Sequence, residues 1–267
     1  MIITDQFVLL NFPRTGSTFV REALASVYGR GGSRFEKVLG RFRPDRDRFR
    51  ELLLPIDRTT TALKVARKSQ HGCYSQIPAA DRGKPVLCVK RNPFERFVSQ
   101  FEQGFWRENP PGDLRELQQL FPEFPDLSFS DYLKMDQVVA YNDVRQGAAV
   151  EADVGTCTLH FIRFFYPDPV AALAGLSDER IDSGEFLRGM PDIHFLQTEN
   201  LVPGLRAFLS SVGFDEDKTS FLVDKPRVNG SPRRGKRTWR DYFTPGEAER
   251  YRQRNRLLFQ MFPECND

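Results

Sequence analysis

The chain has 267 residues, of which 40% are hydrophobic and 28% charged, the balance of a globular protein with a sizeable core. Its net charge of only +3 gives no electrostatic case for a nucleic-acid partner. The four cysteines form no C-x-x-C pair, which argues for a reducing compartment and against a disulfide framework or a zinc site. We find no secretory signal pattern and no long apolar run, so we expect a cytoplasmic protein without a membrane span.

The residue order near the N-terminus predicts a strand, a tight loop and a helix. An apolar run, 7–10, leads into Asn11-Phe12-Pro13-Arg14-Thr15-Gly16-Ser17-Thr18, and an amphipathic run, 19–28, follows. Gly16 permits close approach of a ligand to the backbone, and Ser17 and Thr18 can cap the helix. The helix N-terminus, the hydroxyl groups and the Arg14 guanidinium together favour a phosphate or sulfate at this loop.

Two other interpretations of this loop compete with an anion site. A nucleotide-triphosphate P-loop reads G-x-x-x-x-G-K followed by Ser or Thr, but here Gly16 directly precedes Ser17 and no lysine intervenes. The other interpretation is an ordinary strand-to-helix turn with a hydroxyl cap.

A second strand–helix unit carries another anion motif. Residues 86–89 read as a buried strand, and Asn92 and Pro93 form a cap and first-turn pair for a helix that ends at Gly104. Its apolar positions fall on one face. Arg91 ends the strand and Ser99 lies two turns into the helix, so we expect both at the crevice where open α/β sheets bind ligands.

The remaining pattern predicts an α/β fold with a central parallel sheet flanked by helices. We expect a short helix over 49–54, strands over 59–65 and 192–197, helices near 114–120, from 127 and over 155–166, and a helix ending at Gly213. Thr244-Pro245-Gly246-Glu247 is a capping box that starts the last helix, with Ala248, Tyr251, Leu258 and Phe262 on its packed face.

In these two motifs the sequence resembles the sulfotransferases that use 3′-phosphoadenosine-5′-phosphosulfate (PAPS). Residues 13–18 are similar to the family's 5′-phosphosulfate loop, and Arg91 with Ser99 is similar to its 3′-phosphate pair. The R-N-P-F-E-R wording at 91–96 is closer to the carbohydrate-type and bacterial branch than to the phenol and steroid branch. The resemblance implies the P-loop-like sulfotransferase fold over a single domain, 1–267, with an acceptor-shaping insertion at about 105–189.

The resemblance also implies roles for individual residues. Residues Arg14 to Thr18 would hold the donor's 5′ side, Arg14 would stabilise charge on the bridging oxygen, and Lys64 would hold the sulfonate oxygens. The base is His71 or, as in some glycan and tyrosyl-protein members, Glu36; histidine's unperturbed pKa of about 6.5 suits proton abstraction near neutral pH. The basic loop Arg233-Arg234-Gly235 would close on the 3′-phosphate, and the family uses no metal. His160 and His194 are interpreted as structural.

The expected function is transfer of the sulfuryl group from PAPS, with PAP (3′-phosphoadenosine-5′-phosphate) as product, to a hydroxyl or amine of a small-molecule or carbohydrate acceptor. We favour a glycan or glycolipid. One rival is a P-loop-type small-molecule kinase that uses ATP, against which the missing lysine argues. The second rival is a catalytically silent nucleotide-binding module.

Overall fold

The computed structural model describes residues 1–29, 48–55, 68–111, 113–145, 152–226 and 237–266. The chain divides into two compact units. We call the first, which comprises Met1–Pro55, Lys68–Arg91 and Asp192–Gly230, the sheet unit. The second, which comprises Ile56–Arg67, Asn92–Pro191 and Ser231–Asp267, is the helical unit.

The sheet unit is built on a five-stranded sheet in the order β3-β1-β2-β6-β7. The strands are β1 (Ile2–Thr4), β2 (Val8–Leu10), β3 (Phe49–Glu51), β6 (Val86–Lys90) and β7 (His194–Gln197). β2, β6 and β7 are parallel, whereas β1 pairs antiparallel with both β2 and β3. The carboxyl ends of β2, β6 and β7 therefore lie at one edge, where such sheets bind ligands. The predicted α/β class with a central sheet is confirmed, but the sheet is mostly rather than wholly parallel, because β1 runs antiparallel to β2 and β3.

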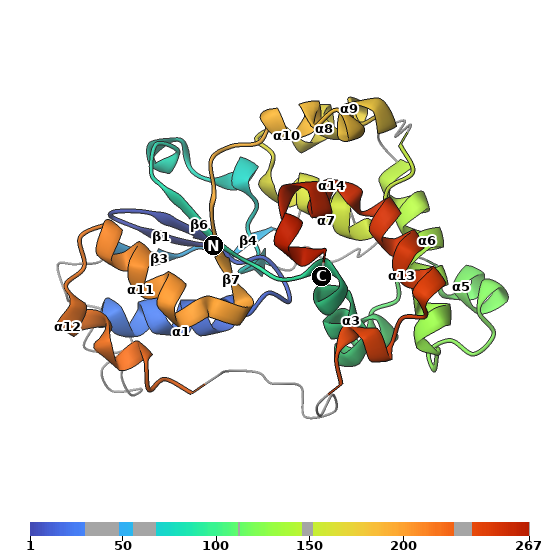
Figure 1. The fold of residues 1–267 in the computed structure, drawn as a ribbon, viewed down its shortest axis with the longest axis horizontal. Coiled ribbons are helices and arrows are strands. Elements are labelled where there is room, and N and C mark those ends of the chain that lie inside the picture. The colour runs from blue at the N-terminus through green and yellow to red at the C-terminus, as the bar shows by residue number, and fades with distance from the viewer. Residues whose placement is uncertain (30–47, 56–67, 112, 146–151, 227–236, 267) are drawn as a thin grey trace. The chain divides into compact units, whose positions relative to one another are not determined.

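Two helices cover one face of this sheet, as Figure 1 shows: α1 (Ser17–Val27) and α11 (Leu201–Ser211). The hydrophobic core between them and the strands comprises Ile2, Phe7, Leu9, Phe19, Val20, Ala23, Leu24, Leu87, Val89, Leu196, Leu205, Phe208, Leu209 and Leu222. Burial of this apolar surface holds both helices against the sheet. The unit also contains β4 (Leu54–Pro55), β5 (Lys68–Ser69), α12 (Glu216–Thr219) and short 3-10 turns at Tyr74–Gln76, Ala79–Asp81, Thr198–Asn200 and Ser220–Leu222.

The structure corrects three local predictions in the sheet unit. The expected helix over 49–54 is wrong, because Phe49–Glu51 forms β3 and pairs with β1. The strand β1 was not predicted. The cap of α1 is Gly16 itself rather than the Ser17 or Thr18 side chain. The expected strand over 59–65 lies outside the described residues.

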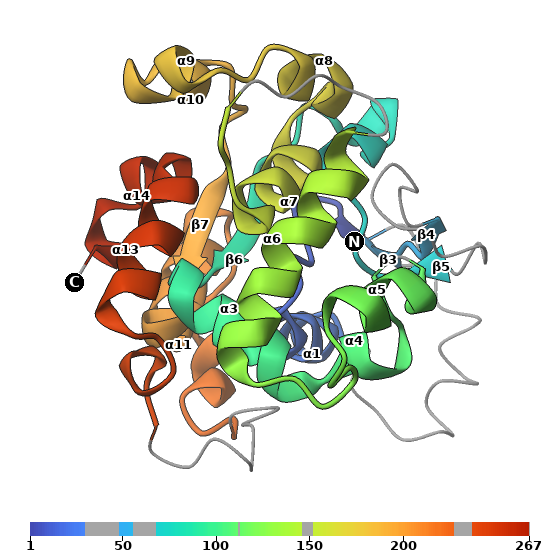
Figure 2. The same cartoon turned by 90° about the vertical axis from the view of Figure 1, so that its right-hand side faces the viewer.

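The described elements of the helical unit are all helices, seen from one side in Figure 2. They are α3 (Pro93–Gln103), α4 (Phe105–Glu108), α5 (Leu114–Leu120), α6 (Phe129–Arg145), α7 (Thr156–Phe165), α8 (Pro169–Ala174), α9 (Asp178–Asp182), α10 (Glu185–Arg188), α13 (Pro245–Arg254) and α14 (Arg256–Met261), with 3-10 turns at Trp239–Asp241 and Pro263–Cys265.

Aromatic side chains fill the core around α3. The Phe94 ring stacks on Trp239 with ring centroids 4.1 Å apart, and Phe97 packs against Tyr132 and Tyr251. The predicted Asn92 cap, Pro93 first turn and Gly104 end of α3 are confirmed, as is the Thr244 capping box of α13.

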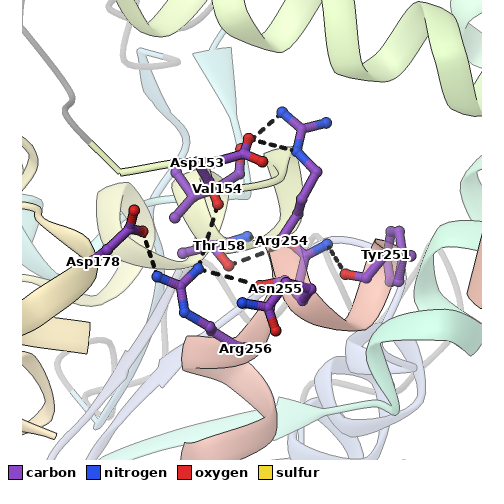
Figure 3. A network of polar contacts seen from close by, with 9 residues as sticks. Asp153, Val154, Thr158, Asp178, Tyr251, Arg254, Asn255 and Arg256 are labelled. Carbon is purple, nitrogen blue, oxygen red and sulfur yellow. Dashed lines mark hydrogen bonds and ion pairs between the residues drawn. The ribbon is translucent and has the colours of Figure 1, made fainter. Parts of the chain in front are cut away.

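A polar network joins the α13–α14 junction to α7, and Figure 3 shows it at close range. The buried Asn255 donates to Tyr251 O (2.9 Å) and its Oδ1 accepts from Thr158 N (3.1 Å). Arg254 pairs with Asp153 at 2.8 Å, and Arg256 pairs with Asp178 and Asp182. These contacts hold a break at Asn255 where the sequence predicted one continuous last helix.

Within the described ranges, every helix is too short or too polar to span a lipid bilayer. The expectation of one domain with an acceptor-shaping insertion at about 105–189 stays a prediction.

Candidate functional site

The candidate anion loop joins β2 to α1 in the sheet unit and contains two residues in the left-handed backbone region. Arg14 has φ 68° and the cap residue Gly16 has φ 88°. A left-handed conformation is easy for glycine but costs an arginine about 1–2 kcal/mol. Alternation between left- and right-handed residues at a helix start is also the arrangement in which successive N–H groups face an anion.

Two hydroxyl groups of the loop are used inside it. Thr15 Oγ1 donates to Phe12 O at 2.9 Å, and Ser17 Oγ donates to the same carbonyl at 3.2 Å. Both side chains are buried. Because each hydroxyl has a single proton to donate, contacts of Thr15 and Ser17 with an anion must come from their backbone N–H groups. Thr18 is only half-buried.

The second predicted motif reaches this loop through Arg91. The residue follows β6, and its Nη1 lies 3.4 Å from the carbonyl oxygen of Arg14, at the long end of hydrogen-bond distances. Arg91 is half-buried. Two segments 77 residues apart in sequence therefore meet at one edge of the sheet, where the Arg91 guanidinium contacts the backbone of Arg14.

Sequence reasoning missed a third contributor, Thr198, which comes directly after β7. Its Oγ1 lies 2.8 Å from Thr15 O and 2.7 Å from Lys90 O. The hydroxyl thus bridges the loop before α1 and the end of β6. A polar residue just past a parallel strand was a signal that could have drawn attention to it.

The candidate base His71 is held against the same loop. Its ring Nδ1 lies 2.7 Å from the Asn11 carbonyl oxygen, while the fully buried Asn11 side chain donates to Gln70 O at 3.2 Å. A carbonyl oxygen only accepts, so Nδ1 carries the proton and the lone pair of the neutral ring lies on Nε2. Burial lowers the pKa of His71. The hydrogen bond to Asn11 raises it in part, and the positive charge of Arg21 lowers it further.

The other predicted site residues lie elsewhere. Ser99 is half-buried on α3 and belongs to the helical unit. Glu36, Lys64, Arg233, Arg234 and Gly235 lie outside the described residues, so their predicted roles stay predictions. His160 lies on α7, and burial lowers its pKa to about 3. His194 is exposed on β7, and its ring packs at a tilt against Phe208.

The part of the chain that the structure describes holds no cluster of three or more His, Cys, Asp or Glu side chains suited to a metal ion.

Comparison with protein-family models and with curated proteins finds no match. Among solved structures, the chain is similar to the crystal structure of mouse sulfotransferase SULT7A1 complexed with PAP. That alignment has 13% identity and a TM-score of 0.41, and it covers 97% of this chain and 84% of the mouse chain. At this level of similarity, function has to be inferred from the residues of the site themselves.

Proposed function

We propose that the chain is a sulfotransferase that moves the sulfuryl group of PAPS to a hydroxyl or amine of an acceptor and leaves PAP. The observation that carries this proposal is the contact of Arg91 with the loop of Arg14, at the carboxyl edge of β2 and β6. This contact supports assigning the two motifs, which separately suit a 5′-phosphosulfate and a 3′-phosphate, to one site.

The residues present fit a nucleotide with phosphate groups on both sides of its ribose. The loop 13–18 would hold the 5′ side with backbone N–H groups and Arg14, and Arg91 would hold the 3′-phosphate. Ser99, with Arg233, Arg234 and Gly235, would complete the second subsite. The donor, when bound, supplies an activated sulfuryl group whose leaving group is the 5′-phosphate.

The chain's own residues then divide the remaining chemistry. Arg14 stabilises negative charge that develops on the leaving oxygen, and Lys64 would hold the sulfonate oxygens. His71 takes the acceptor's proton at Nε2, the nitrogen that the Asn11 carbonyl leaves unprotonated. Since burial lowers the pKa of His71, the ring is in its neutral, basic form at pH 7.

The R-N-P-F-E-R sequence at 91–96 favours a glycan or glycolipid hydroxyl as the acceptor. Residues 105–189 would shape the acceptor pocket. We place the protein in the cytoplasm, with a small-molecule or carbohydrate partner.

The rival function is an ATP-dependent small-molecule kinase. The absence of a lysine before Ser17 argues against it, because that lysine reaches the β- and γ-phosphates in such enzymes.

A thermal-shift comparison of PAP, ATP and AMP tests the proposal, because a ligand at 100 times its Kd stabilises by about 2.7 kcal/mol. We expect PAP to raise Tm most, in the presence of EDTA as well as with Mg²⁺. Arg91→Ala should weaken PAP by about 2–4 kcal/mol, the cost of breaking a charge-assisted pair, and leave AMP nearly unchanged. Arg82→Ala is the control, since that exposed arginine bonds its own loop at Ile77 O.

The rival function gives the opposite results in the same experiment. Stabilisation by ATP above PAP, dependent on Mg²⁺, would support the kinase, whose chemistry needs that ion. Equal losses of PAP and AMP binding in Arg91→Ala would remove Arg91 from the 3′ subsite.

A further inference from the structure

Thr198 occupies the point where three segments of the site meet. β6 and β7 pair in register so that Lys90 faces Gln197, the last residue of β7. Thr198 is therefore the first residue past the paired strands, and its half-buried side chain lies at the ligand-binding edge. There its hydroxyl reaches the carbonyls of Thr15 (2.8 Å) and Lys90 (2.7 Å).

These two carbonyls belong to the two segments that contact different phosphates under the proposed function. Thr15 lies within the 5′ loop, between the left-handed residues Arg14 and Gly16. Lys90 directly precedes Arg91, the residue assigned to the 3′-phosphate. One hydroxyl proton shared between two carbonyl acceptors keeps both backbones close to the same oxygen.

The Thr198 methyl group lies beside the same loop. Its Cγ2 is 3.6 Å from the position that a Cβ on Gly16 would occupy, an ordinary van der Waals distance. The hydroxyl carries the hydrogen bonds to both segments.

We propose that Thr198 is a positioning residue that couples the two phosphate subsites. It fixes the 5′ loop relative to Arg91 at the spacing that a 3′,5′-bisphosphate needs. This inference rests on the proposed function. A ligand with both phosphates gains from that preorganisation, because the second contact forms at no further ordering cost. A ligand with one phosphate needs only one of the two segments and gains little.

The test compares Thr198→Val, which removes the hydroxyl and keeps the branched shape, with Thr198→Ser, which keeps the hydroxyl. Calorimetry measures the Kd of PAP, AMP and 3′-AMP for each variant. We expect Thr198→Val to weaken PAP about 10-fold, the size of one lost buried hydrogen bond, and each monophosphate by less than about 3-fold. Thr198→Ser should bind all three like the wild type. If Thr198→Val fails to fold, Thr198→Ala removes the hydroxyl without adding a methyl group and takes its place.

Amide hydrogen exchange on the ligand-free protein provides a second readout. Exchange at residues 15–18 and 90–91 should rise in Thr198→Val and stay at the wild-type level in Thr198→Ser. Equal weakening of all three ligands, unchanged PAP affinity or unchanged exchange would overturn the coupling role while leaving the proposed function intact. A wild-type protein that binds PAP no more tightly than the monophosphates would overturn the proposed function, and this inference with it.

Discussion

His71 combines the two properties that a general base needs near neutral pH. The Asn11 carbonyl fixes its tautomer, and burial keeps its pKa below the ordinary value of 6.5. A base that is already neutral at pH 7 accepts a proton without first having to lose one. The same lowering of the pKa makes the ring a weaker base, so its geometry has to contribute to the rate.

We predict that His71→Ala lowers kcat by about 10²–10⁴, the range for loss of a general base, while PAP affinity stays near that of the wild type. In the wild type, the acid limb of the pH–rate profile should lie below pH 6.5, because the group must be deprotonated and its pKa is lowered. That limb should vanish in His71→Ala. Steady-state kinetics between pH 5 and 8 measure both effects.

Glu36→Gln is the matched control, because it conserves the shape of the other candidate base. Nearly full turnover in His71→Ala together with loss of activity in Glu36→Gln would assign the base to Glu36. His71 would then be a loop residue that packs against Asn11.

Local spacing predicts the candidate anion loop and Arg91, because both motifs are contiguous strand–turn–helix segments, and the structure brings Arg91 to that loop. The sequence could not show that Thr15 and Ser17 donate their hydroxyl protons to Phe12 O, since this depends on the left-handed turn at Arg14. Thr198 was missed for a different reason. Its position beside Lys90 follows from the register of β6 on β7, which no local pattern encodes.

At the scale of elements, the helix–strand error at 49–54 has a tertiary cause. Phe49–Glu51 has no strong strand pattern of its own, and its pairing with β1 determines its conformation. Propensity is a weak guide wherever a neighbouring strand supplies hydrogen bonds. By contrast, α3 was predicted correctly because its cap, first-turn proline and terminal glycine are all local signals.

The break between α13 and α14 depends on close packing at Gly155. A Cβ on this residue would lie 2.5 Å from Asn255 Nδ2 and 2.6 Å from its Oδ1. The Asn255 side chain cannot move aside freely, because it bonds Tyr251 O and Thr158 N (Figure 3). Gly155 is therefore required for space, and its φ of −86° shows that backbone strain plays no part.

We predict that Gly155→Ala lowers the free energy of unfolding by about 1–3 kcal/mol, the usual cost of overpacking a tight site. Urea denaturation followed by circular dichroism measures the change. Gly246→Ala is the control, because nothing lies within 4 Å of the position of its Cβ. Alanine stabilises the helix α13 relative to glycine by about 0.5–1 kcal/mol, so this variant should not lose stability. Wild-type stability in Gly155→Ala would mean that Asn255 is free to move.

For the whole molecule, the sequence pattern predicted the fold class, since alternating strand and helix signals with motifs at strand ends indicate a parallel sheet. The division of the chain into two units was not predicted. The sheet unit draws on three separate stretches of sequence, and the long return to β7 at His194 carries no composition signal. Continuity of the core, rather than continuity of the sequence, defines the units.

The stability of the whole chain should respond to pH through two groups of the helical unit with opposite effects. Burial lowers the pKa of His160 to about 3, so the folded state resists protonation that the unfolded state accepts below pH 6.5. Burial raises the pKa of Asp136 to about 6, even though Thr156 Oγ1 donates to its carboxylate at 2.6 Å. Acidification therefore costs stability through His160 and adds stability through Asp136.

The last prediction follows from these signs. Between about pH 4 and 6, each group changes the unfolding free energy by up to about 1.4 kcal/mol per pH unit, and the two contributions nearly cancel. His160→Gln removes the acid-sensitive group, so relative to the wild type this variant should gain stability as pH falls from 6 to 4. Asp136→Asn keeps an acceptor for Thr156 but cannot take up a proton, so it should lose stability over the same range. Urea unfolding of the three proteins at pH 4, 5 and 6 measures the slopes, and parallel curves for all three would show that neither group titrates differently on folding.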